Sequence, residues 1–364
     1  MKIIHFGLAA LLLSSASLAR AIPHYTMTVI GPSGSSSTAL NDFGAVVGYS
    51  GSQSGFIYAN GSFTTHRAAG SYATSFVSIN NSGAVVGDAD MPRIPGPGNE
   101  SSTSYGVRYA NGAFTLYQPP AGVNHAWLRG INDSGAMFGH YYTYPVGRVV
   151  VDTGDGPQLL APQLASSHQA YDMNNLGALV GSVTQNSVDR AVVFDNNGGY
   201  SLIGNVAENS VATAINDNGW IGGFYSISLY YTGSFLRDAA GNVTQFTLPS
   251  REIFLSDVNN AGVAVGAAWL PASPDSFGYL FMDGAAIDLN TRLLGSAGWT
   301  LVDAAGINEN GQIAGTACRA STGLCHAVLL DVSPVPEPGA WAMLLAGLAT
   351  VGAGGYRARR RRGA

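Results

Sequence analysis

Charged side chains are scarce in this chain, at 11% of 364 residues, and lysine is almost absent. The only lysine is Lys2, so every basic residue of the body is an arginine. Positions 22 to 335 contain 10 Arg and 21 Asp or Glu, which gives a formal charge of −11. Because phosphate groups bind cationic surfaces, this composition argues against nucleic acid or anionic lipid as a partner of the body.

Signatures of the common catalytic sites are missing as well. The chain has no G-x-S-x-G elbow, no H-E-x-x-H helix, no Walker loop and no pair of C-x-x-C motifs. A histidine hydrogen-bonded at a strand end is a simpler interpretation of each scattered histidine than a ligand or a base. We therefore expect a non-enzymatic protein with no cofactor and no metal centre. The histidines of the body are His24, His66, His125, His140, His168 and His326.

The chain does contain a phrase that occurs seven times: an apolar residue, Asn, a polar residue, any residue, Gly, then small or apolar residues and usually a second Gly. The first glycines of successive copies are separated by 39, 52, 42, 42, 43 and 49 residues. A period of about 40–45 residues is typical of one four-stranded propeller blade. The repeated positions are Asn41, Gly44, Asn80, Gly83, Asn132, Gly135, Asn174, Gly177, Asn216, Gly219, Asn259, Gly262, Asn308 and Gly311.

Each copy of the phrase predicts a tight turn between two strands. Asn accepts a hydrogen bond from its own backbone two residues on, and Gly adopts a positive φ without a steric clash. The polar residue after each Asn could form a ring of cation or sugar ligands. Turn propensity and solvent exposure explain these residues without a ligand, which is the simpler interpretation. These residues are Asp42, Asn81, Asp133, Asn175, Asp217, Asn260 and Glu309.

The segment from Val211 to Phe246 illustrates one complete repeat. Its apolar runs at 211–215, 220–223, 234–237 and 242–246 are too short for helices and lie between turn signals. Asn-Gly pairs between alternating apolar residues, as at Asn60-Gly61, are a strong hairpin signal. Each repeat therefore predicts one four-stranded blade.

The last repeat runs from its third strand directly into Ser333 and Pro334, without a fourth strand. The segment from His24 to Ile30 supplies a spare strand before the first repeat. Pairing the two would close the ring and remove the exposed edges. We predict an all-β protein, a seven-bladed β-propeller over residues 22–333 closed by the N-terminal strand.

The first 21 residues predict a secretory signal peptide. Lys2 is followed by an apolar run to Leu13 and by the sequence Ala19-Arg20-Ala21, the order of a Sec-dependent signal with its cleavage site. The apolar run is too short to cross a membrane, which takes about 20 residues. We expect the Sec translocon to export the chain and the mature protein to begin at Ile22.

The C-terminal segment, 334–364, predicts a single membrane helix. An uncharged stretch of 17 residues, 340–356, is followed by Arg357 and by Arg359, Arg360, Arg361 and Arg362, which keep the tail on the cytoplasmic side. With Pro336, Glu337 and Pro338 just before the helix, this order resembles the PEP-CTERM sorting signal of exported Gram-negative bacterial proteins.

The resemblance implies that an exosortase in the inner membrane recognises the tail. Removal of the tail near Pro336 would then release the protein to the cell surface or to the exopolysaccharide matrix. A permanent single-span anchor is the alternative.

Two cysteines, Cys318 and Cys325, flank a six-residue segment of the last repeat. An even number of cysteines in an exported chain favours a disulfide, which would staple two neighbouring strands. Two thiols and one nearby histidine, His326, make a metal site the weaker interpretation.

The repeats between about Thr26 and Asp331 resemble the HAF family of extracellular repeats. The Asn-x-x-Gly and Val-Gly elements carry the resemblance, together with two copies of a His-Ala phrase at 125–127 and 326–328. That family implies an extracellular location but has no firmly assigned activity, so it transfers no site residues.

Aromatic clusters are the remaining candidates for a binding surface, since sugars stack on ring faces. Tyrosine is also an ordinary strand residue, so either role fits. The segment from Asp88 to Ser104, rich in Pro and Gly, predicts an irregular insertion that serves as a lid or binding loop. The clusters are Tyr141, Tyr142 and Tyr144, and Phe224, Tyr225, Tyr230 and Tyr231 in an expected loop.

The sequence as a whole predicts a non-catalytic surface or matrix protein whose propeller binds polysaccharide or another protein. A secreted propeller hydrolase or lyase acting on polysaccharide is the alternative. Near-regular repeats without a cluster of histidines and carboxylates favour the first.

Overall fold

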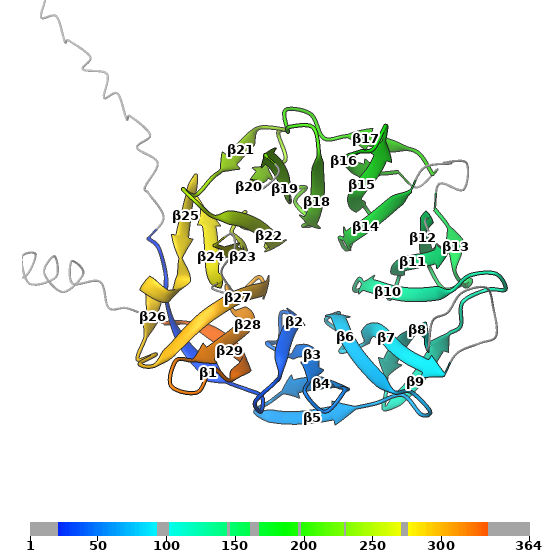
Figure 1. The fold of residues 1–364 in the computed structure, drawn as a ribbon, viewed down its shortest axis with the longest axis horizontal. Helices are drawn as coiled ribbons and strands as arrows, with labels where there is room; N and C mark the ends of the chain where they lie inside the picture. The colour runs from blue at the N-terminus through cyan, green and yellow to red at the C-terminus, as the bar shows by residue number, and fades with distance from the viewer. Residues whose placement is uncertain are drawn as a thin grey trace, which may run out of the picture.

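The computed structural model describes residues 21–92, 102–143, 146–160, 167–195, 198–228, 231–270 and 276–333. These residues form six four-stranded sheets and one five-stranded sheet, arranged as blades around a common centre (Figure 1). The prediction of an all-β, seven-bladed propeller is confirmed.

The first three blades each consist of four consecutive antiparallel strands. They are β2 (Ser36–Leu40), β3 (Val46–Ser50), β4 (Ser54–Ala59) and β5 (Ser62–His66) in blade 1; β6 (Ala73–Ile79), β7 (Val85–Pro92), β8 (Ser102–Ala110) and β9 (Ala113–Tyr117) in blade 2; and β10 (His125–Ile131), β11 (Met137–Thr143), β12 (Val146–Asp152) and β13 (Gln158–Leu159) in blade 3.

Blades 4 to 6 repeat the same order. They are β14 (His168–Met173), β15 (Leu179–Gln185), β16 (Val188–Phe194) and β17 (Tyr200–Leu202); β18 (Ser210–Ile215), β19 (Ile221–Ser228), β20 (Tyr231–Arg237) and β21 (Val243–Phe246); and β22 (Glu252–Val258), β23 (Ala264–Trp269), β24 (Ser276–Met282) and β25 (Ala285–Asp288).

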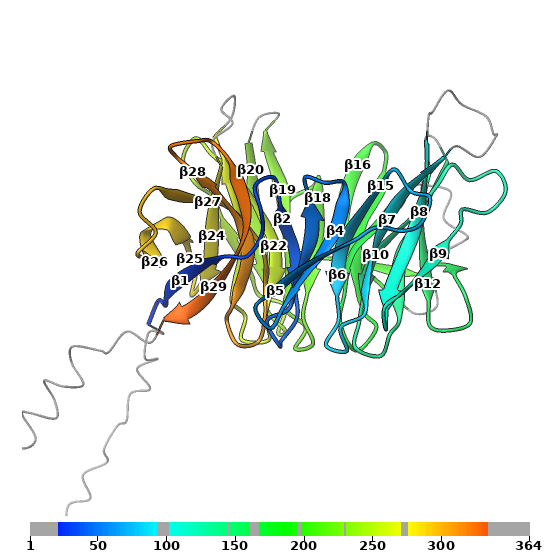
Figure 2. The same ribbon diagram turned by 90° about the horizontal axis from the view of Figure 1, so that it is seen from below.

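Blade 7 combines strands from both ends of the described chain. β27 (Trp299–Ile307), β28 (Ile313–Arg319) and β29 (Cys325–Ser333) are followed by β1 (His24–Val29), which pairs antiparallel with β29. The two strands lie together at the rim of the disc (Figure 2). The sequence did not predict the fifth strand, β26 (Leu293–Leu294), which follows the short 3-10 helix η1 (Leu289–Arg292) and pairs parallel with β1.

The apolar core lies between the faces of neighbouring blades. Val47 of blade 1 packs in one cluster with Phe76 and Val85 of blade 2, and Phe138 of blade 3 packs with Ala170 and other residues of blade 4. Each blade buries one face against the blade before it and the other against the blade after it, as blade 4 does with blades 3 and 5, so closing the circle completes the core.

A steric constraint explains why each repeat carries a second glycine, and the sequence alone did not reveal it. This glycine pairs with the innermost strand of its own blade beside a β-bulge, as Gly139 does opposite Leu128. A Cβ at these glycines would lie 1.9–2.3 Å from a backbone oxygen of the inner strand, which is shorter than the 3.0 Å below which non-bonded Cβ contacts essentially do not occur. The seven glycines are Gly48, Gly87, Gly139, Gly181, Gly223, Gly266 and Gly315.

The prediction of an irregular insertion from Asp88 to Ser104 is wrong at both ends of this segment. Residues up to Pro92 belong to β7 and residues from Ser102 belong to β8, which pair in register as a long hairpin. Alternating side chains and cross-strand pairing outweigh the local Pro and Gly content there. Residues 93–101 lie outside the described residues.

Among the described residues, no helix is long and apolar enough to cross a membrane. Positions 1–20 and 334–364 lie outside the described residues. They contain nearly all of the expected signal peptide and the sorting residues Pro336, Glu337, Pro338, Arg357 and 359–362.

Candidate functional site

The repeated asparagines form a closed circle of hydrogen bonds on the face of the propeller that carries the Asn-x-x-Gly turns. Each side-chain amide donates to the backbone oxygen of the asparagine in the next blade, at 2.6–3.3 Å. Each side-chain oxygen accepts backbone N–H groups of its own turn, as Asn41 Oδ1 does from Phe43 and Ala45. The first glycine of every turn has a φ between +71° and +85°.

The residue after each asparagine forms a second circle beside the first. Its backbone N–H donates to the side-chain oxygen of the equivalent residue in the next blade, from Asp42 to Asn81 through to Glu309 and back to Asp42. Amides also bridge carboxylates, because Asn81 Nδ2 donates to both Asp42 and Asp133. The alternation of Asp and Asn thus joins blades, a role that neither interpretation from the sequence included.

A cavity of about 300 Å³ opens in the central channel, and the innermost strands and the turns of both circles line it with asparagines and six carboxyl side chains. Asp172 and Asp257 occupy equivalent positions and accept the backbone N–H of Ile215 and Ile307 in the following blades, at 2.7 and 2.8 Å. Burial, with a smaller contribution from neighbouring carboxylates, raises the pKa of Asp172 to about 7 and of Asp257 to about 6. Arg129 is the only basic side chain among the described residues that line this cavity.

A second cavity, of about 340 Å³, lies between blades 3 and 4. We call it the blade 3–4 pocket. It lies nearer the face opposite the turns, because Trp127 and Gln169 precede Arg129 and Tyr171 on strands that run toward the asparagine circle. Its lining residues are Trp127, Arg129, His140, Tyr142, Gly147, Gln169, Ala170 and Tyr171.

Aromatic rings and a guanidinium shape this pocket. The Tyr142 ring centroid lies 5.7 Å from that of Trp127, and His125 stacks on Trp127 with centroids 5.2 Å apart. The Arg129 Cζ lies 5.5 Å from the Trp127 centroid, within the range of a cation–π contact. Arg129 and Tyr171 also line the channel cavity, so the two cavities share a wall.

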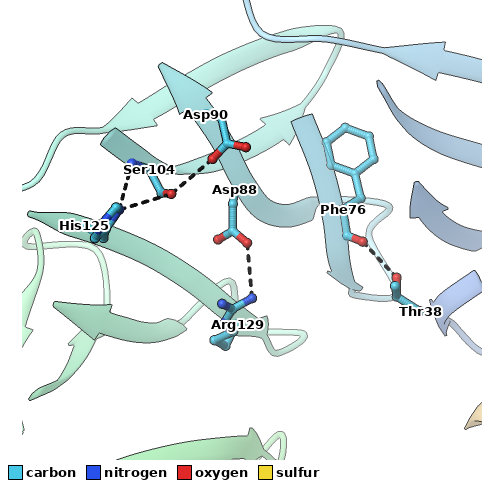
Figure 3. A network of polar contacts seen from close by, with 7 residues as sticks. All are labelled: Thr38, Phe76, Asp88, Asp90, Ser104, His125 and Arg129. Carbon is cyan, nitrogen blue, oxygen red and sulfur yellow. Dashed lines mark hydrogen bonds and ion pairs between the residues drawn. The ribbon is translucent and has the colours of Figure 1, made fainter. Parts of the chain in front are cut away.

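Arg129 is held in place by Asp88 from blade 2, whose Oδ2 lies 3.1 Å from Arg129 Nη1 (Figure 3). Burial raises the pKa of Asp88 to about 6, although the Arg129 charge acts in the opposite direction. This ion pair is the only hydrogen bond of the guanidinium to the described residues. Its other N–H groups are therefore available to a ligand.

Ser104, His125 and Asp90 meet beside the same pocket but are not arranged as a nucleophile and its base (Figure 3). The Ser104 backbone N–H donates to His125 Nδ1 at 3.2 Å, and Ser104 Oγ donates to Asp90 Oδ1 at 3.1 Å. Because Nδ1 has a single lone pair and the serine proton points at the carboxylate, the Oγ contact of 3.3 Å to Nδ1 does not activate the serine.

Other histidines contact backbone atoms. His140 Nε2 accepts the Ala170 N–H at 3.0 Å, and burial lowers the His140 pKa to about 3, so the imidazole is a neutral acceptor. His326 Nδ1 lies 3.0 Å from the Gly31 oxygen and His168 Nε2 lies 3.3 Å from the Leu160 oxygen. In the described part of the chain, no group of three metal-ligating side chains occurs.

The predicted aromatic clusters divide between core and pocket. Tyr141 and Tyr142 lie on β11, and Tyr142 lines the blade 3–4 pocket. The prediction that Phe224 and Tyr225 lie in a loop is wrong, because both lie on β19. Tyr225 is buried, and Phe224 packs edge-on against Phe254. Tyr231 lies on β20, and Tyr144 and Tyr230 are outside the described residues.

Cys318 and Cys325 pair across the β28–β29 hairpin and are joined by a disulfide. The two His-Ala phrases occupy different places in the repeat, since His125 begins the innermost strand of blade 3 and His326 lies on the third strand of blade 7. The first phrase contributes Trp127 to the blade 3–4 pocket.

No family model matches the sequence, and no curated protein matches it. The fold is similar to the β-propeller domain of the Trilobed protease from Pyrococcus furiosus, at 8% identity and a TM-score of 0.52, covering 85% of this chain and 95% of that one. It is also similar to puromycin hydrolase, at 14% identity and a TM-score of 0.51, covering 81% of this chain and 50% of that one. The chain thus spans about half the length of the hydrolase. At such identities the likeness shows the fold alone.

Proposed function

We propose that this protein is an exported, non-catalytic propeller that binds polysaccharide in the blade 3–4 pocket. The observation that carries the proposal is a pocket walled by Trp127 and Tyr142, with the hydrogen-bonding groups of Arg129 and Gln169 at its edge. Aromatic faces with a few convergent polar groups are the general means of holding a sugar ring in water.

The alternative of a hydrolase or lyase receives less support. Glycoside hydrolysis uses two carboxyl groups on either side of the bond that breaks, and no carboxylate is among the described residues that line the blade 3–4 pocket. The carboxyl groups Asp172 and Asp257 line the central channel instead, where each accepts a backbone N–H of the following blade. Ser104, His125 and Asp90, which meet beside the pocket, do not have the hydrogen-bond order that activates a serine nucleophile.

The route to the surface rests on the two ends of the sequence. The signal-peptide pattern of residues 1–21 and the resemblance of 334–364 to a PEP-CTERM signal support export by the Sec translocon, a transient stay in the inner membrane and processing by an exosortase. The closest fit is then a protein of the cell surface or exopolysaccharide matrix.

A glycan array probed with the exported protein tests the proposal. We expect selective binding that Trp127→Ala abolishes, and that Tyr49→Ala leaves intact because Tyr49 is an exposed aromatic in blade 1, away from the pocket. Binding that survives Trp127→Ala would place the ligand elsewhere, and hydrolysis of a bound glycan would support the alternative.

A further inference from the structure

The blade 3–4 pocket offers hydrogen-bond donors more than acceptors. Gln169 Oε1 already accepts the Tyr171 hydroxyl at 2.6 Å, which uses one of its two lone pairs, whereas the described residues take neither N–H of its amide nitrogen. His140 Nε2 is occupied by the Ala170 N–H. Arg129 has five N–H donors, and in the described residues only one of its nitrogens is used, by Asp88. A matching ligand must therefore supply acceptors.

Arg129 is also the only charged residue among the described residues that line this pocket. Its charge reaches the other walls: after burial it is the next cause that lowers the pKa of His140, and it opposes the rise of the pKa of Tyr171 that burial and the Asp189 carboxylate produce. The channel carboxylates line the neighbouring cavity, not this one. The body's net negative charge acts from farther away and is screened over about 8–10 Å at physiological ionic strength. Contact with the guanidinium therefore decides which charge the pocket prefers.

Building on the proposed function, we infer that the blade 3–4 pocket selects an acidic sugar, a uronic acid residue of an anionic polysaccharide. The pyranose ring lies against Tyr142 and the part of the Trp127 indole that His125 and Arg129 leave uncovered, and its carboxylate pairs with the free N–H groups of Arg129. Gln169 and Tyr142 are placed to bond the hydroxyl groups of the same sugar. Guanidinium and carboxylate match in a planar, two-bonded geometry that a hydroxyl group cannot reproduce.

Asp88 acts on this site as a positioning residue. It fixes Arg129 through Nη1 and at the same time competes with a ligand carboxylate for the positive charge. Replacing Asp88 by Asn removes the competing charge and keeps a hydrogen-bond acceptor. The Asp88→Asn variant is thus expected to bind a uronate at least as tightly as the native protein, a result that loss of folding or a purely structural role of Asp88 would not produce.

Calorimetric titration of the exported protein with oligouronides of galacturonic, glucuronic, mannuronic and guluronic acid tests the inference. For the oligogalacturonide, the fully methyl-esterified form is the uncharged match. We expect at least one acid form to bind tenfold or more tightly than an uncharged form. Arg129→Gln should lose that preference, whereas Arg190→Gln should keep it because Arg190 forms an exposed ion pair with Glu208 in blade 4.

The outcomes separate the inference from the function on which it rests. Equal binding of charged and uncharged oligosaccharides, or an equal loss of both in Arg129→Gln, would overturn the acidic-sugar inference while leaving a Trp127-dependent glycan site standing. Absence of binding to every glycan would overturn both. If Arg129→Gln does not fold, the ratio of acid-form to ester-form affinity in the native protein and in Asp88→Asn still tests the acidic-sugar inference. A ratio near one in both proteins would overturn it.

Discussion

Asn308 in blade 7 donates its side-chain amide to the backbone oxygen of Asn41 in blade 1, at 3.0 Å and across 267 positions of sequence. This bond closes a circle that runs through all seven repeats. The propeller is therefore closed twice, once at its rim by β1 and β29 and once around its channel by the asparagines. The repeat phrase contributes to joining the blades as well as to forming turns.

Replacing Asn41 by Ala should destabilise the protein by about 1–3 kcal/mol, because the Asn80 backbone oxygen loses one of its two donors and the turn loses its side-chain acceptor. Urea unfolding measures the change. Asn242→Ala is the matched control, since Asn242 bonds only Asp238 within an exposed hairpin. Equal losses in the two variants would mean that the circle adds nothing to the local turns.

Gly139→Ala should destabilise the protein by about 1–3 kcal/mol or more, as overpacked sites do. A Cβ there would lie 1.9 Å from the Trp127 oxygen, so the inner strand of blade 3 must move. At Gly204 a Cβ would meet nothing within 4 Å, which makes Gly204→Ala the control. Thermal unfolding compares the two, and a Gly139→Ala protein as stable as the native one would contradict the steric reason for the second glycine.

Asp172 should make the protein less stable as pH rises. Its folded pKa, about 7, exceeds the ordinary value of 3.8, so between these values the native state holds a proton that the unfolded chain has released. The stability from Asp172 is present below about pH 4 and is lost as pH rises through about 7. Asp257 acts in the same direction up to its own pKa of about 6.

Melting temperatures at about pH 5 and pH 8 measure this effect. The native protein should lose more stability over that range than Asp172→Asn, which cannot ionise there. Asp238→Asn is the control, because hydrogen bonds from Asn242 lower the pKa of that fully exposed carboxylate. An Asp172→Asn protein with the native pH profile would show that the carboxylate is not desolvated in solution.

Replacing Pro336, Glu337 and Pro338 by Ala should leave export intact but trap the protein in the inner membrane with its tail. The physical reason is that proline restricts its own φ and disfavours a helical conformation of the residue before it, so alanines there would be expected to offer a protease a less extended segment. Mass spectrometry of the surface or matrix fraction of the native strain should detect chains that end near Pro336. Detection in that fraction of intact chains that still contain residues 357–364 would contradict the prediction, because the tail would then be a permanent anchor or have no role in sorting.

The sequence predicted what is local and left out what depends on neighbouring blades. The seven turns were visible because Asn and Gly encode a turn within five residues, and blade number follows from counting them. The hydrogen bonds of Asn41 to Asn80 and of Asp42 to Asn81 join residues 39 positions apart, so no local pattern announces them. The two-residue strand β26 is likewise too short for a periodic signal.

The blade 3–4 pocket escaped prediction for the same reason. Trp127 stood in a noted phrase and Tyr142 in a noted cluster, but Arg129 and Gln169 carried no motif, and Asp88 was assigned to an irregular insertion. Only the packing of β10, β11 and β14 brings these side chains together. The usable signal was the tryptophan two residues before an arginine on an innermost strand, a position that the other repeats fill differently.

The register of β1 against β29 pairs His24 with Ser333, so the two ends of the described chain leave the ring at the same point. Tension between these ends would open the β1–β29 hydrogen bonds one pair at a time, as in a zipper, instead of shearing them together. A propeller held by both ends would therefore yield first at blade 7. A propeller held by one end alone would carry no load across the β1–β29 pair, so this pair would stay closed.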